Sequence, residues 1–326
     1  MKNLITCLIA AASMSFAVSH ASAQTTWNMP TNYADQQFQT ANNHWFAEEV
    51  ERRTDGQLKI NIHSNASLYK MSEILQAVRS GQVAAGEILI SSYANDDPIF
   101  AVDTLPFLAA SRERAWALYE AQKPYLEAAL EDQGMKLLYS VLWPGQGIYT
   151  RKPIENLEDL KGIKLRAPSP MISELAARVG AQPVVIPLPE VSQAFLTGTV
   201  SAMIVSSATI DTKPWEYAEY YYTTDAMLPR NAVFVNERQF NRLPEDVKEI
   251  VMEVAREAEA RGWDLMPQSD EDNKSIMREH DMQVLAPSDA LMQGFNEVGD
   301  QILANWLEQA GEEGKSLIDD YRAAIK

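Results

Sequence analysis

The chain has 326 residues and is strongly acidic, with 45 aspartates and glutamates against 28 lysines and arginines, which gives a formal net charge of -17. Nucleic acids and anionic lipid surfaces bind to cationic faces, so this balance argues against both as partners. One cysteine and four histidines without metal-ligand spacing predict neither a zinc site nor thiol chemistry, and we expect no cofactor. A chain of this length exceeds what one hydrophobic core usually supports, so two lobes are expected.

The first residues have the pattern of a secretion signal. Lys2 precedes an apolar run over residues 4–18, and the small residues Ala-Ser-Ala at 21–23 provide a cleavage site. No later segment approaches the roughly 20 apolar residues that a membrane span requires. The only cysteine, Cys7, lies inside this segment, so we expect neither a disulfide nor a lipid-modified terminus. We predict that residues 1–23 are removed and that the mature protein is periplasmic.

The first part of the chain alternates strands and helices. The pattern predicts a strand over residues 25–30 and, from apolar residues at helical spacing, a helix over 37–53. Alternation of apolar and polar residues predicts a strand over 58–62, and a helix is expected over 72–80. This order is typical of an α/β fold with a mostly parallel sheet.

The next part leads to a crossing between the lobes. We expect a strand over 83–92, helices over 111–119 and 123–133, and a strand over 136–143. The Pro-Gly-Gln-Gly sequence at 144–147 has the composition of a turn. The chain is therefore expected to enter the second lobe there.

The second lobe should combine short strands with short helices. Strands are predicted over 147–151, 163–167 and 202–206, and helices over 171–179 and 189–196. Because no segment has a flexible-linker composition, we expect the lobes to be joined by structured crossings.

An alternating strand over 231–236 should return the chain to the first lobe, and residues 244–266 have the composition and apolar stripe of a long helix. The predicted division is lobe I at 24–145 and 233–270, lobe II at 146–232 and 271–305, and a C-terminal helical segment at 306–326.

The segment 152–168, KPIENLEDLKGIKLRAP, places Arg166 at the end of a short alternating strand, before a proline-bounded turn. Strand ends are where open α/β sheets bind ligands, and a guanidinium group matches a carboxylate with two parallel hydrogen bonds. The alternative is a solvated strand-end charge. The segment resembles the Pro-Ile…Leu-Glu-Asp-Leu-Lys-Gly-x-Lys-x-Arg signature of the substrate-binding proteins of tripartite ATP-independent periplasmic (TRAP) transporters.

This resemblance extends over nearly the whole mature chain. It implies a two-lobed periplasmic-binding-protein clam-shell, with a long helix spanning both lobes and the ligand between them. It also implies that Arg166 grips the carboxylate of the substrate. Gln146 lies where relatives carry an Arg or Gln that hydrogen-bonds the same substrate, although a solvated turn amide is an equal alternative.

Aromatic and polar side chains near the expected crossings and strand ends are the other candidates. Trp143, Tyr149 and Trp215 would wall an apolar pocket, with core packing as the alternative. Tyr69 and Lys70 lie in a loop that contacts substrate in relatives, unless the lysine is simply solvated. Hydroxyl and amide groups that end or open predicted strands complete the set: Ser91, Ser92, Tyr93 and Asn231.

The sequence departs from the family pattern after the expected helix at 189–196. Relatives often have Gly-x-Val-Asp-Gly there, whereas this chain has Gly-Thr-Val-Ser-Ala at 198–202. Near Val205, sialic-acid-binding relatives place an Asn and cation-assisted 2-oxoacid binders place a Glu, and neither is present. A sialic acid and a bound metal ion therefore lose support. The two hydroxyls of Ser206 and Ser207 suit a smaller or less polar acid.

These observations predict a TRAP transporter receptor that is not an enzyme. It would bind an organic acid anion, preferably an aromatic or partly apolar monocarboxylate, and deliver it to the membrane permease subunits, with a monomer as the default. A C4-dicarboxylate or a sugar acid is the alternative ligand. A periplasmic sensor module and a secreted hydrolase are the alternatives from other classes, although no Gly-x-Ser-x-Gly elbow supports a hydrolase.

Overall fold

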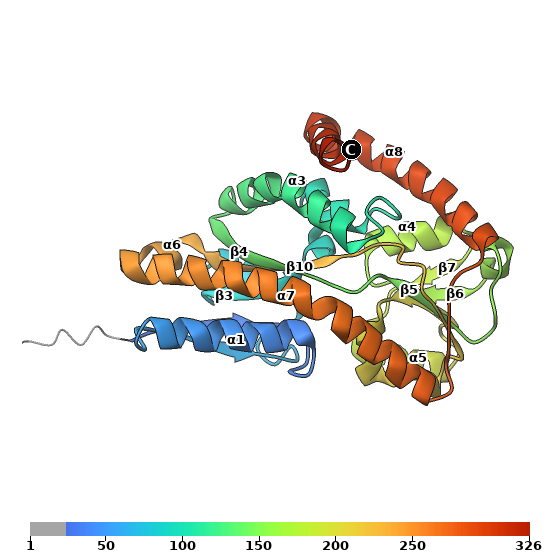
Figure 1. Ribbon diagram of the computed structural model, residues 1–326, viewed down its shortest axis with the longest axis horizontal. Coiled ribbons are helices and arrows are strands. Elements are labelled where there is room, and N and C mark those ends of the chain that lie inside the picture. The colour runs from blue at the N-terminus through green and yellow to red at the C-terminus, as the bar shows by residue number, and fades with distance from the viewer. Residues whose placement is uncertain (1–23) are drawn as a thin grey trace, which may run out of the picture.

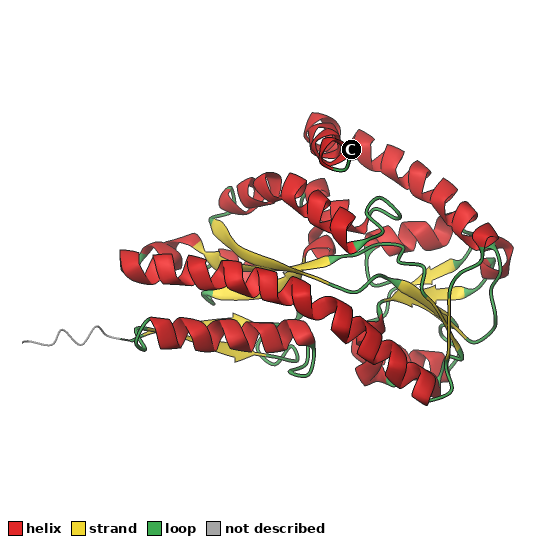
Figure 2. Ribbon diagram, viewed as in Figure 1, coloured by secondary structure: helices red, strands yellow, loops and turns green. Residues whose placement is uncertain are grey.

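The computed structural model describes residues 24–326, and the predicted signal at 1–23 lies outside the described residues. Two groups of strands lie toward opposite ends of the long axis, with helices packed around them (Figure 2). This is a mixed α/β, two-lobed architecture, as the sequence predicted. Within the described range, no helix combines the length and apolar character that crossing a bilayer demands.

The first lobe is built on two small sheets. Strands β1 (Thr25–Pro30) and β2 (Leu58–His63) pair in parallel. In the second sheet β10 (Arg230–Asn236) lies between β3 (Ala85–Leu89) and β4 (Met135–Leu142) and is antiparallel to both. The return strand predicted at 231–236 is thus the central strand of this sheet, where every one of its residues is buried.

Helices cover both faces of these strands. On one face α1 (Phe38–Arg53) packs on β2 and on α7 (Glu245–Glu279), which also covers β4. On the other face α2 (Met71–Arg79) packs on β3, and α3 (Arg112–Glu131) packs on β4. The short α6 (Glu237–Asn241) follows β10 directly.

The second lobe contains a six-stranded mixed sheet. Its order is β11 (Gln283–Leu285), β9 (Tyr220–Tyr222), β5 (Gly147–Thr150), β8 (Ala202–Val205), β6 (Lys164–Arg166) and β7 (Gln182–Val184). Strands β6, β7 and β8 run parallel, while β5 is antiparallel to β8 and β9. Helices α4 (Pro170–Arg178) and α5 (Val191–Leu196) complete the lobe.

Two long helices belong to both lobes (Figure 1). Helix α7 (Glu245–Glu279) contacts α1 and β4 in the first lobe and β11 in the second, so it is the long spanning helix expected from the sequence. Helix α8 (Asp289–Ala324) packs on α3 and on α4, and it changes direction at Gly311, whose φ is +60°. Only glycine adopts this backbone conformation without steric strain.

Short 3₁₀ helices occupy several connections. They are η1 (Ile90–Tyr93), η2 (Pro98–Thr104), η3 (Leu157–Leu160), η4 (Leu188–Glu190), η5 (Ser207–Thr212) and η6 (Pro214–Glu216).

Some predicted element boundaries were wrong. The strand expected over 83–92 ends at Leu89, because the chain turns into η1, so Ser91, Ser92 and Tyr93 lie in a 3₁₀ turn. The two helices expected over 111–133 are one helix, α3, which tolerates Pro124 in its interior. The long helix does not end near residue 266 but continues through Pro267 to Glu279. In both helices packing on the lobes outweighs the local cost of the proline.

Candidate functional site

Loops at strand ends bring the polar candidates of the two lobes toward one another. In the first lobe, the carboxyl ends of β3 and β4 and the amino end of antiparallel β10 share one edge, which places Trp143 and Asn231 there. In the second lobe, Arg166 ends β6 and Ser206 directly follows β8, its parallel neighbour. These edges are where open α/β sheets bind ligands.

Arg166 is the central charge of this region. Its side chain is buried, with 4% of the residue exposed, and its Nε donates to the carbonyl of Ile186 at 2.9 Å. No carboxylate of the described residues lies within 4.0 Å of the guanidinium group. Burial lowers the pKa of Arg166 to about 10, which still leaves it cationic at neutral pH. Because a buried charge needs a counter-charge, this position is suited to an anion.

Asn231 organises the first-lobe edge. Its Oδ1 accepts a hydrogen bond from Trp143 Nε1 at 2.8 Å and a longer one from the Tyr33 hydroxyl at 3.4 Å. Its Nδ2 donates to Oε1 of buried Glu87 at 2.9 Å. The amide therefore holds two aromatic side chains against the sheet, and its own capacity is largely used within the protein.

The two lobes meet at these aromatic rings. Tyr33 and Trp143 pack with ring centroids 4.9 Å apart, and they form one buried cluster with Ala208 of η5, which follows strand β8 of the second lobe. Gln37, at the start of α1, donates from Nε2 to the Ala208 carbonyl at 2.9 Å. Burial raises the pKa of Tyr33, and the positive charge of Arg166 partly opposes that rise, so the two side chains lie within electrostatic range across the interface.

Three further predicted residues place polar groups at the same strand ends. The Ser91 hydroxyl is buried without a hydrogen-bond partner among the described residues. Gln146 is buried in the crossing, where its side-chain amide makes only a long bond of 3.3 Å to the Pro144 carbonyl. Ser206 is also buried, and its carbonyl, not its hydroxyl, bonds Tyr149 and Thr209. All three retain hydrogen-bonding capacity for a ligand.

The comparisons with known proteins agree with this arrangement. Residues 29–309 match the family of bacterial extracellular solute-binding proteins, family 7. The chain belongs to this family. It comprises the substrate receptors of TRAP transporters, which are not enzymes.

Solved structures of two Bordetella pertussis receptors are close to this one. DctP6, an extracytoplasmic solute receptor binding pyroglutamic acid, is 42% identical with a TM-score of 0.90 over 92% of this chain and 100% of that one. DctP7, also binding pyroglutamic acid, is 38% identical with a TM-score of 0.89, over 91% of this chain and 99% of that one. A solute-binding protein of Albidiferax ferrireducens is 26% identical over 267 residues, which are 78% of this chain and 76% of that protein.

Several predicted side chains of this TRAP receptor are engaged in packing or in bonds within one lobe. Tyr149 is fully buried in the core of the second lobe, against Tyr221 at 4.4 Å between ring centroids. Trp215 stacks on His280 at 3.9 Å, at the end of α7. The Ser207 hydroxyl donates to Asp270 of α7 at 2.5 Å. A ligand contact by any of these stays a prediction.

Predicted side chains in and near the loop before α2 also form hydrogen bonds within the first lobe. The Tyr69 hydroxyl donates to Gln82 at 3.0 Å, and Lys70 is exposed. The Tyr93 hydroxyl bonds the backbone at Met71, which ties η1 to the start of α2. Ser92 lies half-buried in the same turn. Their roles toward a ligand also remain predictions.

Sequence reasoning missed Tyr33, Glu87 and Gln37. Tyr33 follows strand β1, so the strand-end criterion that selected the other candidates would also have selected it. Glu87 is a lone acid within the apolar run of residues 83–90, which is itself a signal of a special role. No local pattern marks Gln37, because its partner Ala208 is 171 residues away.

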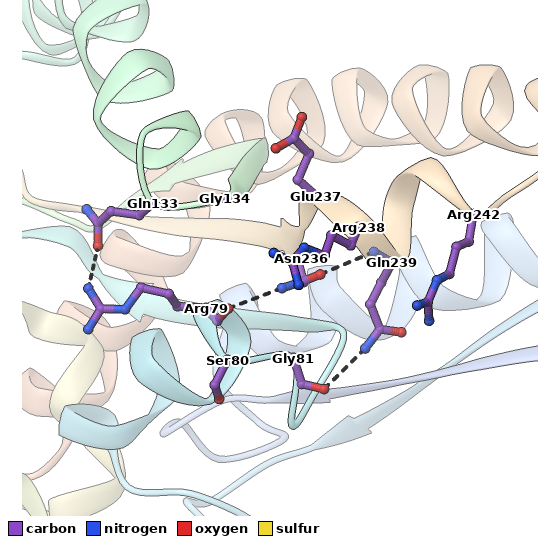
Figure 3. A pocket seen from close by; sticks show the side chains of 10 residues that line it. All are labelled: Arg79, Ser80, Gly81, Gln133, Gly134, Asn236, Glu237, Arg238, Gln239 and Arg242. Atoms are coloured by element: carbon purple, nitrogen blue, oxygen red, sulfur yellow. Dashed lines mark hydrogen bonds between the residues drawn. The ribbon is translucent and has the colours of Figure 1, made fainter.

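A pocket of about 540 Å³ lies elsewhere, beside α6 at the end of the first lobe (Figure 3). Its lining includes the exposed arginines Arg79, Arg238 and Arg242, and Arg79 donates to Gln133 at 3.0 Å. None of the lining residues comes from the second lobe or from the predicted site. Among residues 24–326, no cluster of three His, Cys, Asp or Glu side chains could hold a metal ion.

Proposed function

We propose that this TRAP receptor binds a small, partly apolar monocarboxylate between its lobes, with pyroglutamate as the first candidate. The observation that carries the proposal is Arg166, a buried guanidinium group with no carboxylate partner among residues 24–326. The ligand carboxylate would supply the missing counter-charge and two parallel hydrogen bonds.

The surroundings of Arg166 support a compact ring rather than a polyhydroxylated chain. Tyr33, which lies within electrostatic range of Arg166, belongs to one buried cluster with Trp143 and Ala208, and this cluster offers an apolar surface. The Ser91 hydroxyl and the Gln146 side-chain amide can each donate and accept a hydrogen bond. This suits a lactam, which carries one N–H and one C=O. Two relatives at 42% and 38% identity bind pyroglutamic acid, a partly apolar but not aromatic acid.

A second carboxylate, as in a C4-dicarboxylate, would need a second buried cation. The other fully buried arginine, Arg230, lies 3.6 Å from the Asp103 carboxylate, so its charge is already compensated. Lys70 is exposed to solvent. The charges of the described residues therefore favour a monocarboxylate over a dicarboxylate.

We further propose that the chain is secreted, is cut after residue 23, and works in the periplasm as a monomer that delivers its ligand to the membrane permease subunits. Family membership supports an extracytoplasmic site of action. Reconstitution of the mature protein with the permease subunits in vesicles tests delivery. Uptake of labelled ligand should then require this receptor.

Calorimetric titration of the mature protein with pyroglutamate, aromatic acids, C4-dicarboxylates and sugar acids tests the ligand assignment. We expect pyroglutamate to bind most tightly. Arg166→Ala should lose about 2 to 5 kcal/mol of binding free energy, because the buried carboxylate would have no cation. Arg238→Ala, which removes an exposed arginine remote from the site, is the matched control and should bind normally. Wild-type affinity in Arg166→Ala would rule out the carboxylate clamp.

A further inference from the structure

Glu87 is a buried acid that the carboxylate clamp does not use. It lies on β3 with 1% of the residue exposed, and no lysine, arginine or histidine of the described chain lies within 4.0 Å of its carboxylate. Its two oxygens accept hydrogen bonds from the Thr31 hydroxyl and from Asn231 Nδ2. Burial raises the pKa of Glu87, and these two bonds, together with the Asn43 amide, oppose the rise. An acid kept in such a place without a cation needs a reason.

The sheet sets Glu87, Asn231 and Trp143 in one diagonal row. Asn231 pairs with Leu89 of β3 and with Val141 of β4. Glu87 stands two residues before Leu89, and Trp143 stands two residues after Val141, so both are diagonal neighbours of Asn231. Diagonal neighbours on one face of an antiparallel pair are close enough to bond. Three adjacent strands therefore hold the row rigidly.

Hydrogen bonds along this row can run in one direction only. The indole Nε1 of Trp143 is only a donor, so it must face Oδ1 of Asn231. The Asn231 amide nitrogen must then point the other way and needs an acceptor, which Glu87 provides. Without that acceptor the amide would be free to rotate and would release Trp143 and Tyr33.

We propose that Glu87 is a positioning residue that acts through Asn231 to fix the Trp143 and Tyr33 rings, and that this row determines which acids the receptor selects. The inference rests on the proposed function, because these rings flank the ligand only if Arg166 holds its carboxylate. The row would orient the surface that meets the rest of the ligand, while Arg166 alone would recognise the carboxylate. Damage to the row should therefore reduce discrimination between acids more than it reduces carboxylate binding.

A donor–acceptor exchange tests the row. In Glu87→Leu, an apolar side chain of similar size replaces the carboxylate, so the Asn231 amide nitrogen has no acceptor. In the double variant Glu87→Gln/Asn231→Asp, the glutamine amide can donate to the new aspartate and accept from Thr31, while the aspartate still accepts from Trp143 and Tyr33. The double variant also has the net charge of the wild type. Every bond of the row can then form, with only the central one reversed.

Titration with pyroglutamate and with lactate, a carboxylate without a ring, measures selectivity. We expect Glu87→Leu to lower the affinity ratio of the two acids at least tenfold and the double variant to keep it within about threefold of the wild type. A mere loss of stability would weaken both acids alike and would leave the ratio unchanged. A double variant that is no more selective than Glu87→Leu overturns the inference, while wild-type binding in the same series keeps the proposed function.

The indole N–H resonance of Trp143, assigned with Trp143→Phe, gives a readout that needs no ligand. We expect it to shift in Glu87→Leu, because the Asn231 amide is then free to rotate away from the indole, and to show a hydrogen-bonded indole in the double variant, where the aspartate accepts from it. If it stays at its wild-type position in Glu87→Leu, Glu87 does not fix the ring through Asn231 and the inference fails, whichever acid the receptor binds.

Discussion

Two buried arginines in this receptor have opposite surroundings. Arg230 is 1% exposed, lies 3.6 Å from the carboxylate of Asp103, donates to Gln122, and sits over the Tyr119 ring at 4.6 Å. Arg166 is almost as buried and has only a backbone carbonyl as a hydrogen-bond partner among the described residues. The charge of Arg230 is satisfied within the protein, so its role is structural. Arg166 has the unsatisfied charge that a receptor for anions requires.

The Asp103 partner of Arg230 should make stability depend on pH. Burial, only partly opposed by Arg230, raises the pKa of Asp103 to about 6, above its ordinary value of 3.8. The folded protein therefore holds the carboxyl proton of Asp103 more tightly than the unfolded chain does. The stability that this proton contributes is fully present below pH 4 and disappears as the pH rises through 6. Relative to Asp103→Asn, the wild-type free energy of unfolding should fall by up to about 3 kcal/mol between pH 4 and 6.

Urea unfolding of both proteins at several pH values checks this, because the difference between them cancels the titration of other groups. A difference that rises or stays flat between pH 4 and 6 would show that the Asp103 pKa is not raised in the folded protein.

The sequence allowed Arg166 to be predicted because its signal is local: a motif, a strand end and a turn within 17 residues. Trp143 and Asn231 were also found as candidates from their positions next to predicted strands. The hydrogen bond between Trp143 and Asn231 could not be predicted, because it depends on the register of β10 against β4. For Tyr149, the sequence could not separate a core aromatic from a ligand-facing one, since both have the same local pattern.

At the level of elements, the lobes are joined by contacts of two kinds. Helices α7 and α8 pack on both lobes, which fixes their connection away from the site. At the site itself, the start of α1 meets η5 through Gln37, whose Nε2 donates to the Ala208 carbonyl at 2.9 Å and lies 3.5 Å from Asp211 Oδ2. The first set of contacts is extensive, whereas the second consists of the polar Gln37 bridge and the packing of Tyr33 and Trp143 with Ala208. We infer that this bridge opens when ligand leaves. The residues at which each lobe begins and ends stay a prediction.

Gln37→Ala should weaken ligand binding through faster release. The bridge exists only when the lobes are together, so its loss should destabilise the bound form by about 1 kcal/mol, the net value of a typical hydrogen bond, or roughly fivefold in affinity. Stopped-flow measurement of the dissociation rate tests this, because most affinity changes of this kind lie in dissociation. Gln293→Ala removes an exposed glutamine of α8 and serves as the control. An unchanged dissociation rate in Gln37→Ala would show that the bridge does not hold the lobes.

Some element boundaries could not be predicted because long-range packing decides them. Nothing in residues 83–92 marks the turn at Ile90 as the end of the strand, since the apolar run continues into η1. Pro267 locally favours a helix end, but the helix continues because the residues beyond it pack on η5 and β11. The alternation of strands and helices, which reflects burial on one face, was predicted more reliably.

For the whole molecule, the shared helices imply that the lobes fold together. One apolar core contains Val102 of η2, Leu165 of β6, Leu175 of α4 and Phe295 of α8, so it joins residues of both lobes. The Trp306 indole of α8 also donates to the Pro98 carbonyl at 2.8 Å. Neither lobe can lose its structure without exposing this common core to water. The protein should therefore behave as one cooperative unit, despite its two lobes.

Scanning calorimetry of the mature protein should show one transition whose calorimetric and van't Hoff enthalpies agree. Pyroglutamate at about 100 times its Kd should stabilise the folded protein by about 2.7 kcal/mol and move the whole transition upward by several degrees, because ligand bound at the interface holds both lobes. In Arg166→Ala the same concentration should move the single transition by no more than about a third of that amount. Two transitions, of which ligand moves only one, would mean that the lobes unfold independently and that the common core does not couple them.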